Sequence, residues 1–267
     1  MLLAIDIGNT RVKLGLFDGP DLVADFQLRA DRERTPDEYA VQLSTLLSLR
    51  GQTPADVDAA AMACVVPRLG ETLREFARRH LRCEPLVVRA ETNTGLRIRY
   101  DPPSALGPDR LVNAVAAWTL WGAPENTACV VVDYGTATKL EAVSREGEYL
   151  GGAILPGIGI SLDALFDRAA LLRRVDLHAP PAAAIGANTA DALRSGILLG
   201  YAAQTDGLVR RFFQELGGSA RVIATGGIAP LIAPHAETIA VLDPHLTLTG
   251  LRLIHERAAR AGVESVV

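Results

Sequence analysis

A short motif that joins an acidic residue to a glycine-containing turn occurs once in each half of the 267-residue chain. The first copy is Asp6–Thr10 (DIGNT) and the second is Asp133–Thr138 (DYGTAT). An apolar run precedes each copy, Leu2–Ile5 in the first case and Cys129–Val132 in the second. Each motif is therefore expected to follow a buried strand, and the repetition predicts a duplicated fold.

The residues of both turns suit phosphate binding. Glycine lets backbone N–H groups approach phosphate oxygens, hydroxyl and amide side chains donate further hydrogen bonds, and a carboxylate holds a hydrated cation. The residues concerned are Asp6, Gly8, Asn9, Thr10, Gly135 and Thr136. One such turn is equally compatible with an ordinary hairpin, but two copies in separate halves favour a nucleotide bound from both sides.

The chain has 27 lysines and arginines together, yet its only lysines are Lys13 and Lys139, one beside each turn. A compact ammonium serves as a point charge for phosphate where a planar guanidinium does not fit. With so small a count, coincidence is the alternative, so the two lysines only support the prediction of phosphate chemistry.

The order of elements predicts an α/β fold with a restart in the middle of the chain. In the first half we expect strands over 2–9, 11–18, 22–29, 59–66 and 85–89, and helices over 36–49, 68–81 and 110–121. In the second half we expect strands over 128–133, 138–144, 149–155 and 221–227, and helices over 160–172, 188–216 and 245–260. The restart predicts two domains, residues 1–122 and 123–267.

Charge, cysteine content and hydropathy indicate which partners and which cellular compartment to expect. The formal net charge of -4 and a pI near 5.8 give no basic field for nucleic acid. The three cysteines, Cys64, Cys83 and Cys129, are widely spaced and are expected to be buried, reduced thiols. No apolar run is long enough for a membrane span and no basic leader precedes the first strand, so we expect a cytoplasmic protein.

Taken in order, the motifs resemble those of the type III pantothenate kinases, members of the acetate kinase, sugar kinase and actin-like ATPase superfamily. The resemblance covers nearly the whole chain. It is carried by Asp6–Thr10, Thr92–Leu96, Tyr100, Gly107–Arg110, Asp133–Thr138, Gly151-Gly152, Pro156-Gly157, Asn188-Thr189 and Thr225–Gly227.

The resemblance implies two actin-like (ribonuclease H-like) α/β domains with a nucleotide cleft between them. It also implies a kinase that transfers a phosphoryl group from ATP to the terminal hydroxyl of pantothenate, giving 4'-phosphopantothenate in the first step of coenzyme A biosynthesis. A homodimer, Mg²⁺ with the nucleotide, and a monovalent cation (K⁺ or NH₄⁺) are further implications.

The resemblance also assigns site residues. The nucleotide-binding residues are Asp6, Gly8, Asn9, Thr10, Lys13, Gly135 and Thr136. The pantothenate-binding residues are Tyr100, Gly107, Asp109, Arg110 and Thr189, with Thr189 reaching across a dimer interface. Asp109 is the expected general base, and Asp133 the expected ligand of the monovalent cation.

The chemistry of the Asp109-Arg110 pair fits these roles. A carboxylate accepts the hydroxyl proton once the new oxygen–phosphorus bond has begun to form. A guanidinium pairs through its planar fork with a carboxylate, which pantothenate carries. Taken by local sequence alone, the same pair is typical of an exposed helix N-terminus with a favourable dipole charge.

Two positions depart from the family pattern: Lys139 stands where a threonine is usual, and Pro108 where a small residue such as alanine is usual. Because alternate side chains of a strand point to opposite faces, we expect Thr136 and Thr138 to face the phosphates and Lys139 to face away. The competing interpretation is that Lys139 supplies, beside Asp133, the charge that potassium otherwise provides.

Two other functions remain compatible with the motifs. One is a different phosphotransferase or phosphohydrolase of the same superfamily, because phosphate turns alone do not choose the acceptor. The other is a regulatory relative that kept the fold and lost turnover. The loop from Tyr100 to Arg110 argues against the first, and the intact Asp6, Asp109 and Asp133 argue against the second.

Overall fold

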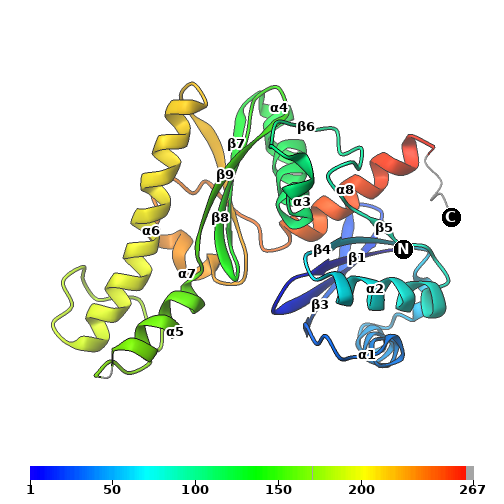
Figure 1. Ribbon diagram of the computed structural model, residues 1–267, viewed down its shortest axis with the longest axis horizontal. Helices are drawn as coiled ribbons and strands as arrows, with labels where there is room; N and C mark the ends of the chain where they lie inside the picture. The colour runs from blue at the N-terminus through cyan, green and yellow to red at the C-terminus, as the bar shows by residue number, and fades with distance from the viewer. Residues whose placement is uncertain (170, 263–267) are drawn as a thin grey trace. The chain divides into compact units, whose positions relative to one another are not determined.

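A computed structural model describes residues 1–169 and 171–262 of the chain. The chain folds into two compact units (Figure 1). The first unit is formed by residues 1–116 together with the segment that begins at Leu246, and the second unit by residues 117–245.

The first unit is built on a five-stranded sheet with the order β3-β2-β1-β4-β5. Its strands are β1 (Leu2–Ile7), β2 (Arg11–Asp18), β3 (Asp21–Arg29), β4 (Ala59–Cys64) and β5 (Leu86–Val87). The first three are antiparallel neighbours, and β4 and β5 add in parallel. β1 is buried along its whole length, as its unbroken apolar run predicts.

Helices cover both faces of this sheet. On one face, α1 (Pro36–Ser48) and α2 (Pro67–Phe76) contribute Tyr39, Leu43 and Phe76 to the core (Figure 1). The capping box predicted at the start of α1 is confirmed, since Thr35 and Glu38 bond each other's backbone N–H groups. On the other face lies α8 (Leu246–Arg260), and α3 (Pro108–Ala117) packs against α8 at Gly250.

The second unit repeats the topology of the first. Its strands follow the order β11-β10-β7-β8-β9, with β7, β8 and β9 antiparallel and β10 and β11 parallel to β7. They are β7 (Ala128–Tyr134), β8 (Ala137–Val143), β9 (Glu148–Pro156), β10 (Ala220–Thr225) and β11 (Val241–Leu242). Three antiparallel strands followed by two parallel ones occur in both units, and this shared order confirms the predicted duplication.

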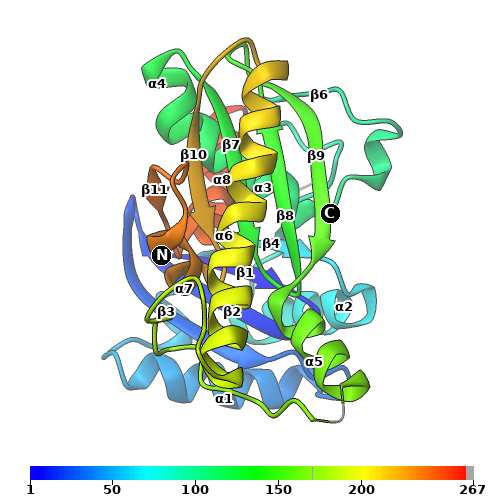
Figure 2. The ribbon, with the colours of Figure 1, turned by 90° about the vertical axis from the view of Figure 1, so that its left-hand side faces the viewer.

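A long helix, α6 (Thr189–Glu215), runs across the second sheet (Figure 2). Leu198, Ala202 and Val209 of α6 join the core with α7 (Ala229–Ile232). The other helices of this unit are α4 (Ala123–Glu125) and α5 (Ile158–Arg168).

Shorter elements complete the chain. Three 3₁₀ turns lie at Pro54–Asp56, Pro103–Ala105 and Ala233–His235, two π turns at Ala77–Leu81 and Trp118–Gly122, and the two-residue strand β6 at Arg97–Ile98. Among the described residues, none of the helices is long and apolar enough to cross a membrane.

The last helix departs from the predicted domain boundaries. The sequence places 245–260 in the second domain, but α8 contacts β1, β2 and β4 of the first unit. Leu246, Leu251 and Ile254 form its buried face. Gly250 permits a close approach, because a Cβ there would lie 2.3 Å from the carbonyl oxygen of Val112 in α3.

The three cysteines are free, as predicted. Cys129 is buried and Cys64 and Cys83 are half-buried. Burial raises the pKa of all three thiols, that of Cys129 to about 12, so they remain protonated near neutral pH.

One glycine contact ties α5 to the second turn and gives a test of the fold. A Cβ at Gly157 would lie 2.1 Å from the carbonyl oxygen of Thr136, closer than any real contact allows. We expect Gly157→Ala to lower the free energy of unfolding by roughly 1–3 kcal/mol, measured in urea, because backbone must move to admit the methyl group.

The control is Gly159→Ala, two residues further on. That position is exposed in α5 and has no atom within 4 Å of an added Cβ. Alanine there should leave stability unchanged or raise it by up to about 1 kcal/mol through helix propensity. Equal unfolding midpoints for the two variants would show that α5 does not rest on the turn.

Candidate active site

The first phosphate turn leaves the end of β1 and is held tightly. The N–H of Gly8 donates to the carbonyl oxygen of Arg11 at 3.0 Å, which closes the turn. A Cβ at Gly8 would lie 3.1 Å from that same oxygen. Asn9 and Thr10 lie at the tip with exposed side chains, so their donors can reach a ligand.

Asp6 and Lys13 face each other across this turn. They are direct partners in the antiparallel pairing of β1 with β2, so their side chains share one face of the sheet. Lys13 Nζ lies 3.9 Å from Asp6 Oδ2, and Asp6 is 9% exposed. The predicted nucleotide-binding residues of the first unit therefore lie together at the carboxyl end of β1.

The second turn has the same construction. The N–H of Gly135 donates to the carbonyl oxygen of Ala137 at 3.1 Å, and Thr136 is exposed at the tip. Gly157 packs directly against the backbone of this turn at Thr136. Gly226, with a φ of +99°, lies where a Cβ would be 2.5 Å from the carbonyl oxygen of Tyr134. Gly226 therefore has a backbone-packing role that the sequence did not reveal.

Tyr134, the second residue of the motif, points into the core. Burial raises the pKa of its phenol to about 12, and the hydroxyl lies 2.6 Å from Thr205 Oγ1. Tyr134 is thus a neutral structural residue.

The expectation that Lys139 faces away from the site is wrong. Lys139 is the direct partner of Asp133 in the pairing of β7 with β8, and its Nζ lies 2.9 Å from Asp133 Oδ2. Thr138, expected to face the phosphates, is 2% exposed and points to the opposite face. The alternation of period two is present, but its phase is the reverse of the predicted one.

Beside Asp133, the Lys139 ammonium lies where the monovalent cation was expected. The Lys139 ammonium already pairs with that carboxylate, and both side chains are only 15% exposed. A second cation about 4 Å from the ammonium would meet a repulsion on the order of 4 kcal/mol at an effective dielectric constant of 20. A monovalent ion bound there would therefore compete with the ammonium that Asp133 already holds.

A divalent ion bound mainly by phosphate does fit the first turn. No group of three or more His, Cys, Asp or Glu side chains suited to a metal occurs within residues 1–169 and 171–262. Mg²⁺ at kinase sites keeps waters and binds through one or two carboxylates plus substrate phosphates. Asp6, whose nearest oxygen lies 3.9 Å from the Lys13 ammonium, is the carboxylate at this turn.

The predicted substrate residues of the first unit lie around the start of α3. Asp109 is in its first turn, and its Oδ1 lies 2.7 Å from where a Cβ at Gly107 would be, so a side chain at position 107 would displace the carboxylate. Arg110 is 6% exposed. Its guanidinium lies over the ring of Tyr100 at 5.1 Å, and its Nη1 donates to the Tyr100 hydroxyl at 3.3 Å. The fork of Arg110 is thus oriented before any ligand arrives.

Thr189 belongs to the second unit and opens α6. Asn188 caps the helix by accepting a hydrogen bond from the N–H of Asp191 at 2.9 Å. Thr189 itself is exposed. The predicted site residues therefore belong to different elements. Asp6 and Lys13 lie at the first turn, Asp133 at the second turn, the pantothenate-binding residues at the start of α3, and Thr189 at the start of α6.

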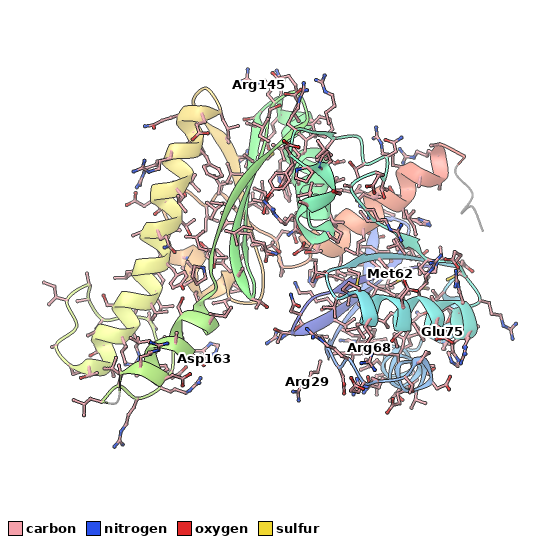
Figure 3. All side chains as sticks on the ribbon, in the orientation of Figure 1. Arg29, Met62, Arg68, Glu75, Arg145 and Asp163 are labelled. Carbon is pink, nitrogen blue, oxygen red and sulfur yellow. The ribbon has the colours of Figure 1, made fainter. Side chains whose placement is uncertain are left out.

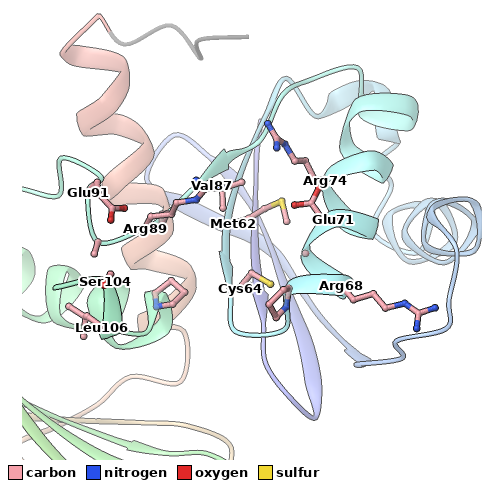
Figure 4. A pocket seen from close by; sticks show the side chains of 15 residues that line it. Met62, Cys64, Arg68, Glu71, Arg74, Val87, Arg89, Glu91, Ser104 and Leu106 are labelled. Carbon is pink, nitrogen blue, oxygen red and sulfur yellow. The ribbon is translucent and has the colours of Figure 1, made fainter. Parts of the chain in front are cut away.

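A cavity of about 530 Å³ in the first unit was not predicted (Figure 4). Met62 and Cys64 lie at its centre, Arg74 and Glu71 reach it from α2, and Leu106 lies on the opposite side. Met62 belongs to β4 (Figure 3). No predicted site residue lines this cavity, although Leu106 belongs to the substrate loop. Gly70 lines the cavity too, and a Cβ there would lie 2.7 Å from the Cys64 sulfur, but nothing in the local sequence marks this cavity.

A second, open hollow of about 400 Å³ lies beside the first turn. Thr10 and Arg11 line it together with the end of β3, where Arg29 is exposed (Figure 3). Arg11 bonds Gln27 at 3.0 Å. The surroundings of the first turn are therefore rich in arginine.

Solved structures with the same fold include two distant proteins. A Campylobacter jejuni protein described as a Baf family transcriptional activator has a TM-score of 0.57 at 20% identity, covering 97% of this chain and 99% of the other. The (R)-2-hydroxyglutaryl-CoA dehydratase component A of Acidaminococcus fermentans has a TM-score of 0.53 at 15% identity, covering 98% and 99%. Together with the repeated strand order, they show the duplicated actin-like α/β fold.

Sequence relatives are much closer. The type III pantothenate kinase of Desulfatibacillum aliphaticivorans is 47% identical over 261 residues, which cover 98% of this chain and 100% of the relative. That of Roseiflexus sp. (strain RS-1) is 48% identical over 256 residues, 96% of this chain and 98% of the relative. The family profile of type III pantothenate kinases matches residues 2–211. The chain belongs to the type III pantothenate kinase family.

Proposed function

We propose that this protein phosphorylates the terminal hydroxyl of pantothenate with ATP, in the cytoplasm, as a homodimer. Family membership supports the kinase reaction and the use of ATP with a divalent metal. The observation that carries the assignment of residues is the pair of equivalent turns, each with an aspartate and a lysine paired across it. This arrangement suits phosphoryl transfer, because catalysis of that reaction consists mainly of positioning and charge neutralisation.

In this proposal the turns serve the nucleotide. Gly8, Asn9 and Thr10 donate to phosphate oxygens from the first turn, and Lys13 adds a point charge. Gly135 and Thr136 do so from the second. Mg²⁺ bound to the phosphates would neutralise charge on the transferring group, with Asp6 as its carboxylate.

The start of α3 serves pantothenate. Asp109, whose carboxylate lies close to Gly107, accepts the proton of the attacking hydroxyl. Arg110 binds the carboxylate of pantothenate, because its guanidinium is buried against Tyr100 and already oriented. Tyr100 forms the apolar wall.

The surface of α6 supports the dimer. An exposed stripe of small residues runs along the helix at spacings of three and four. It consists of Ala192, Gly196, Gly200, Ala203 and Gly207. An added Cβ at any of these three glycines would meet no atom within 4 Å. Small residues allow close approach of a second helix, as at an isologous interface between two copies of the chain.

We expect Asp109→Asn to keep the fold and ATP binding while lowering kcat by about 10²- to 10⁴-fold, because the amide cannot accept the proton. The measurement is ADP release that depends on pantothenate, with ATP binding followed separately. Asp101→Asn is the matched control, since Asp101 is exposed in the same loop. Near-wild-type turnover of a folded Asp109→Asn variant would remove Asp109 from the mechanism.

Thr189 gives a test of shared sites. If it completes the pantothenate site of the partner subunit, Thr189→Ala and Asp109→Asn should each be inactive alone. Subunit exchange between them should create heterodimers with one intact site, recovering roughly a quarter of wild-type activity for random pairing in a twofold dimer. Absence of recovery after exchange confirmed by mass spectrometry would place Thr189 outside the neighbouring site.

Gly200→Leu tests the interface itself. Because a Cβ at this exposed position meets no atom of its own chain, the monomer fold should persist while sedimentation shows loss of the dimer, and activity should fall with it. Glu215→Leu, exposed on another face of α6, should leave the dimer intact. A dimeric Gly200→Leu variant would exclude this stripe from the interface.

A further inference from the structure

The second turn carries a built-in positive charge. Lys139 Nζ and Asp133 Oδ2 are 2.9 Å apart, and the two side chains are held by direct pairing of their strands. Both are largely buried, unlike surface pairs such as Arg68–Glu33, whose side chains are 69% and 77% exposed. A partly buried pair on paired strands is screened little by solvent and keeps one geometry.

The first unit contains the same device at the equivalent place. Lys13 stands opposite Asp6 on β2 as Lys139 stands opposite Asp133 on β8. The other 25 of the 27 lysines and arginines in the sequence are arginines, so these two positions are the only ones with a lysine. An ammonium is a compact point charge, whereas a guanidinium is broad and planar. A lysine paired with the aspartate at each turn therefore places a compact cation at both.

We infer that Lys139 is a tethered monovalent cation: its ammonium holds Asp133 and supplies positive charge beside the second phosphate turn, so the enzyme needs no potassium or ammonium ion. An ammonium group and K⁺ carry the same charge and both bind oxygen. The tethered group differs because it is present at every turnover, whatever the ionic composition of the solution. This inference rests on the proposed function, since the reaction makes the charge useful.

The first experiment uses the wild-type dimer in buffers whose only cations are Mg²⁺ and bulky organic ions, with ATP supplied as an organic salt. Pantothenate-dependent ADP release should be fully present, and added KCl or NH₄Cl should change kcat by less than about twofold. Activation by potassium of about tenfold or more would overturn the inference, because a tenfold rate difference marks a real contribution to transition-state stabilisation.

The second experiment removes the ammonium. Lys139→Thr should lose about 10²-fold in kcat in the organic-cation buffer, the size of effect seen when one charge-stabilising group is removed. Potassium or ammonium should then restore activity. Arg221→Gln is the matched control: it removes a basic partner of Glu125 elsewhere in the second unit and should create no potassium dependence. A fully active Lys139→Thr variant without potassium would also overturn the inference.

A third measurement separates this inference from the proposed function. Thermal unfolding with a non-hydrolysable ATP analogue should give a Tm that rises with potassium for Lys139→Thr but not for the wild type. If the wild type shows no pantothenate-dependent ADP release in any buffer, the proposed function fails. The Tm measurement then decides the role of Lys139 alone, and a wild-type Tm that rises with potassium as the variant's does would overturn it.

Discussion

Each half of the molecule must stabilise a carboxylate at the end of its central strand. A buried charge is costly unless a partner of opposite sign lies beside it. The hairpin that leaves the strand provides that partner, because antiparallel pairing places Lys13 opposite Asp6 and Lys139 opposite Asp133. The tight turn between the paired strands keeps this pairing in register, and at the second turn Gly157, just before α5, packs against Thr136.

Periodicity and local signals were sufficient for most of the fold. The apolar runs predicted β1 and β7, and Thr35 with Pro36 and Glu38 predicted the start of α1. The sheet against which α8 packs was not predictable, because an amphipathic pattern shows that one face is buried but not which sheet covers it. The cavity around Met62 and the short strand β6 arise from tertiary contacts and leave no local signal.

The site illustrates the same limit on a smaller scale. The identity of the turn residues followed from their chemistry, but the direction of Lys139 did not. Both faces of β8 are largely buried, so hydrophobic alternation does not reveal which face Lys139 shares. The register with β7, set by the short turn after Gly135, decides the phase. A sequence read one residue at a time lacks that information.

The scarcity of lysine has a practical consequence for the study of this protein. Side-chain amines occur only at Lys13 and Lys139, and both are tied to carboxylates at the turns. Amine-directed reagents therefore have few targets besides the terminal amino group. Acylation of either side chain would convert a cation at a turn into a neutral amide. Chemical labelling, which reports on scattered surface sites in most proteins, would here report on two defined positions of the duplicated fold.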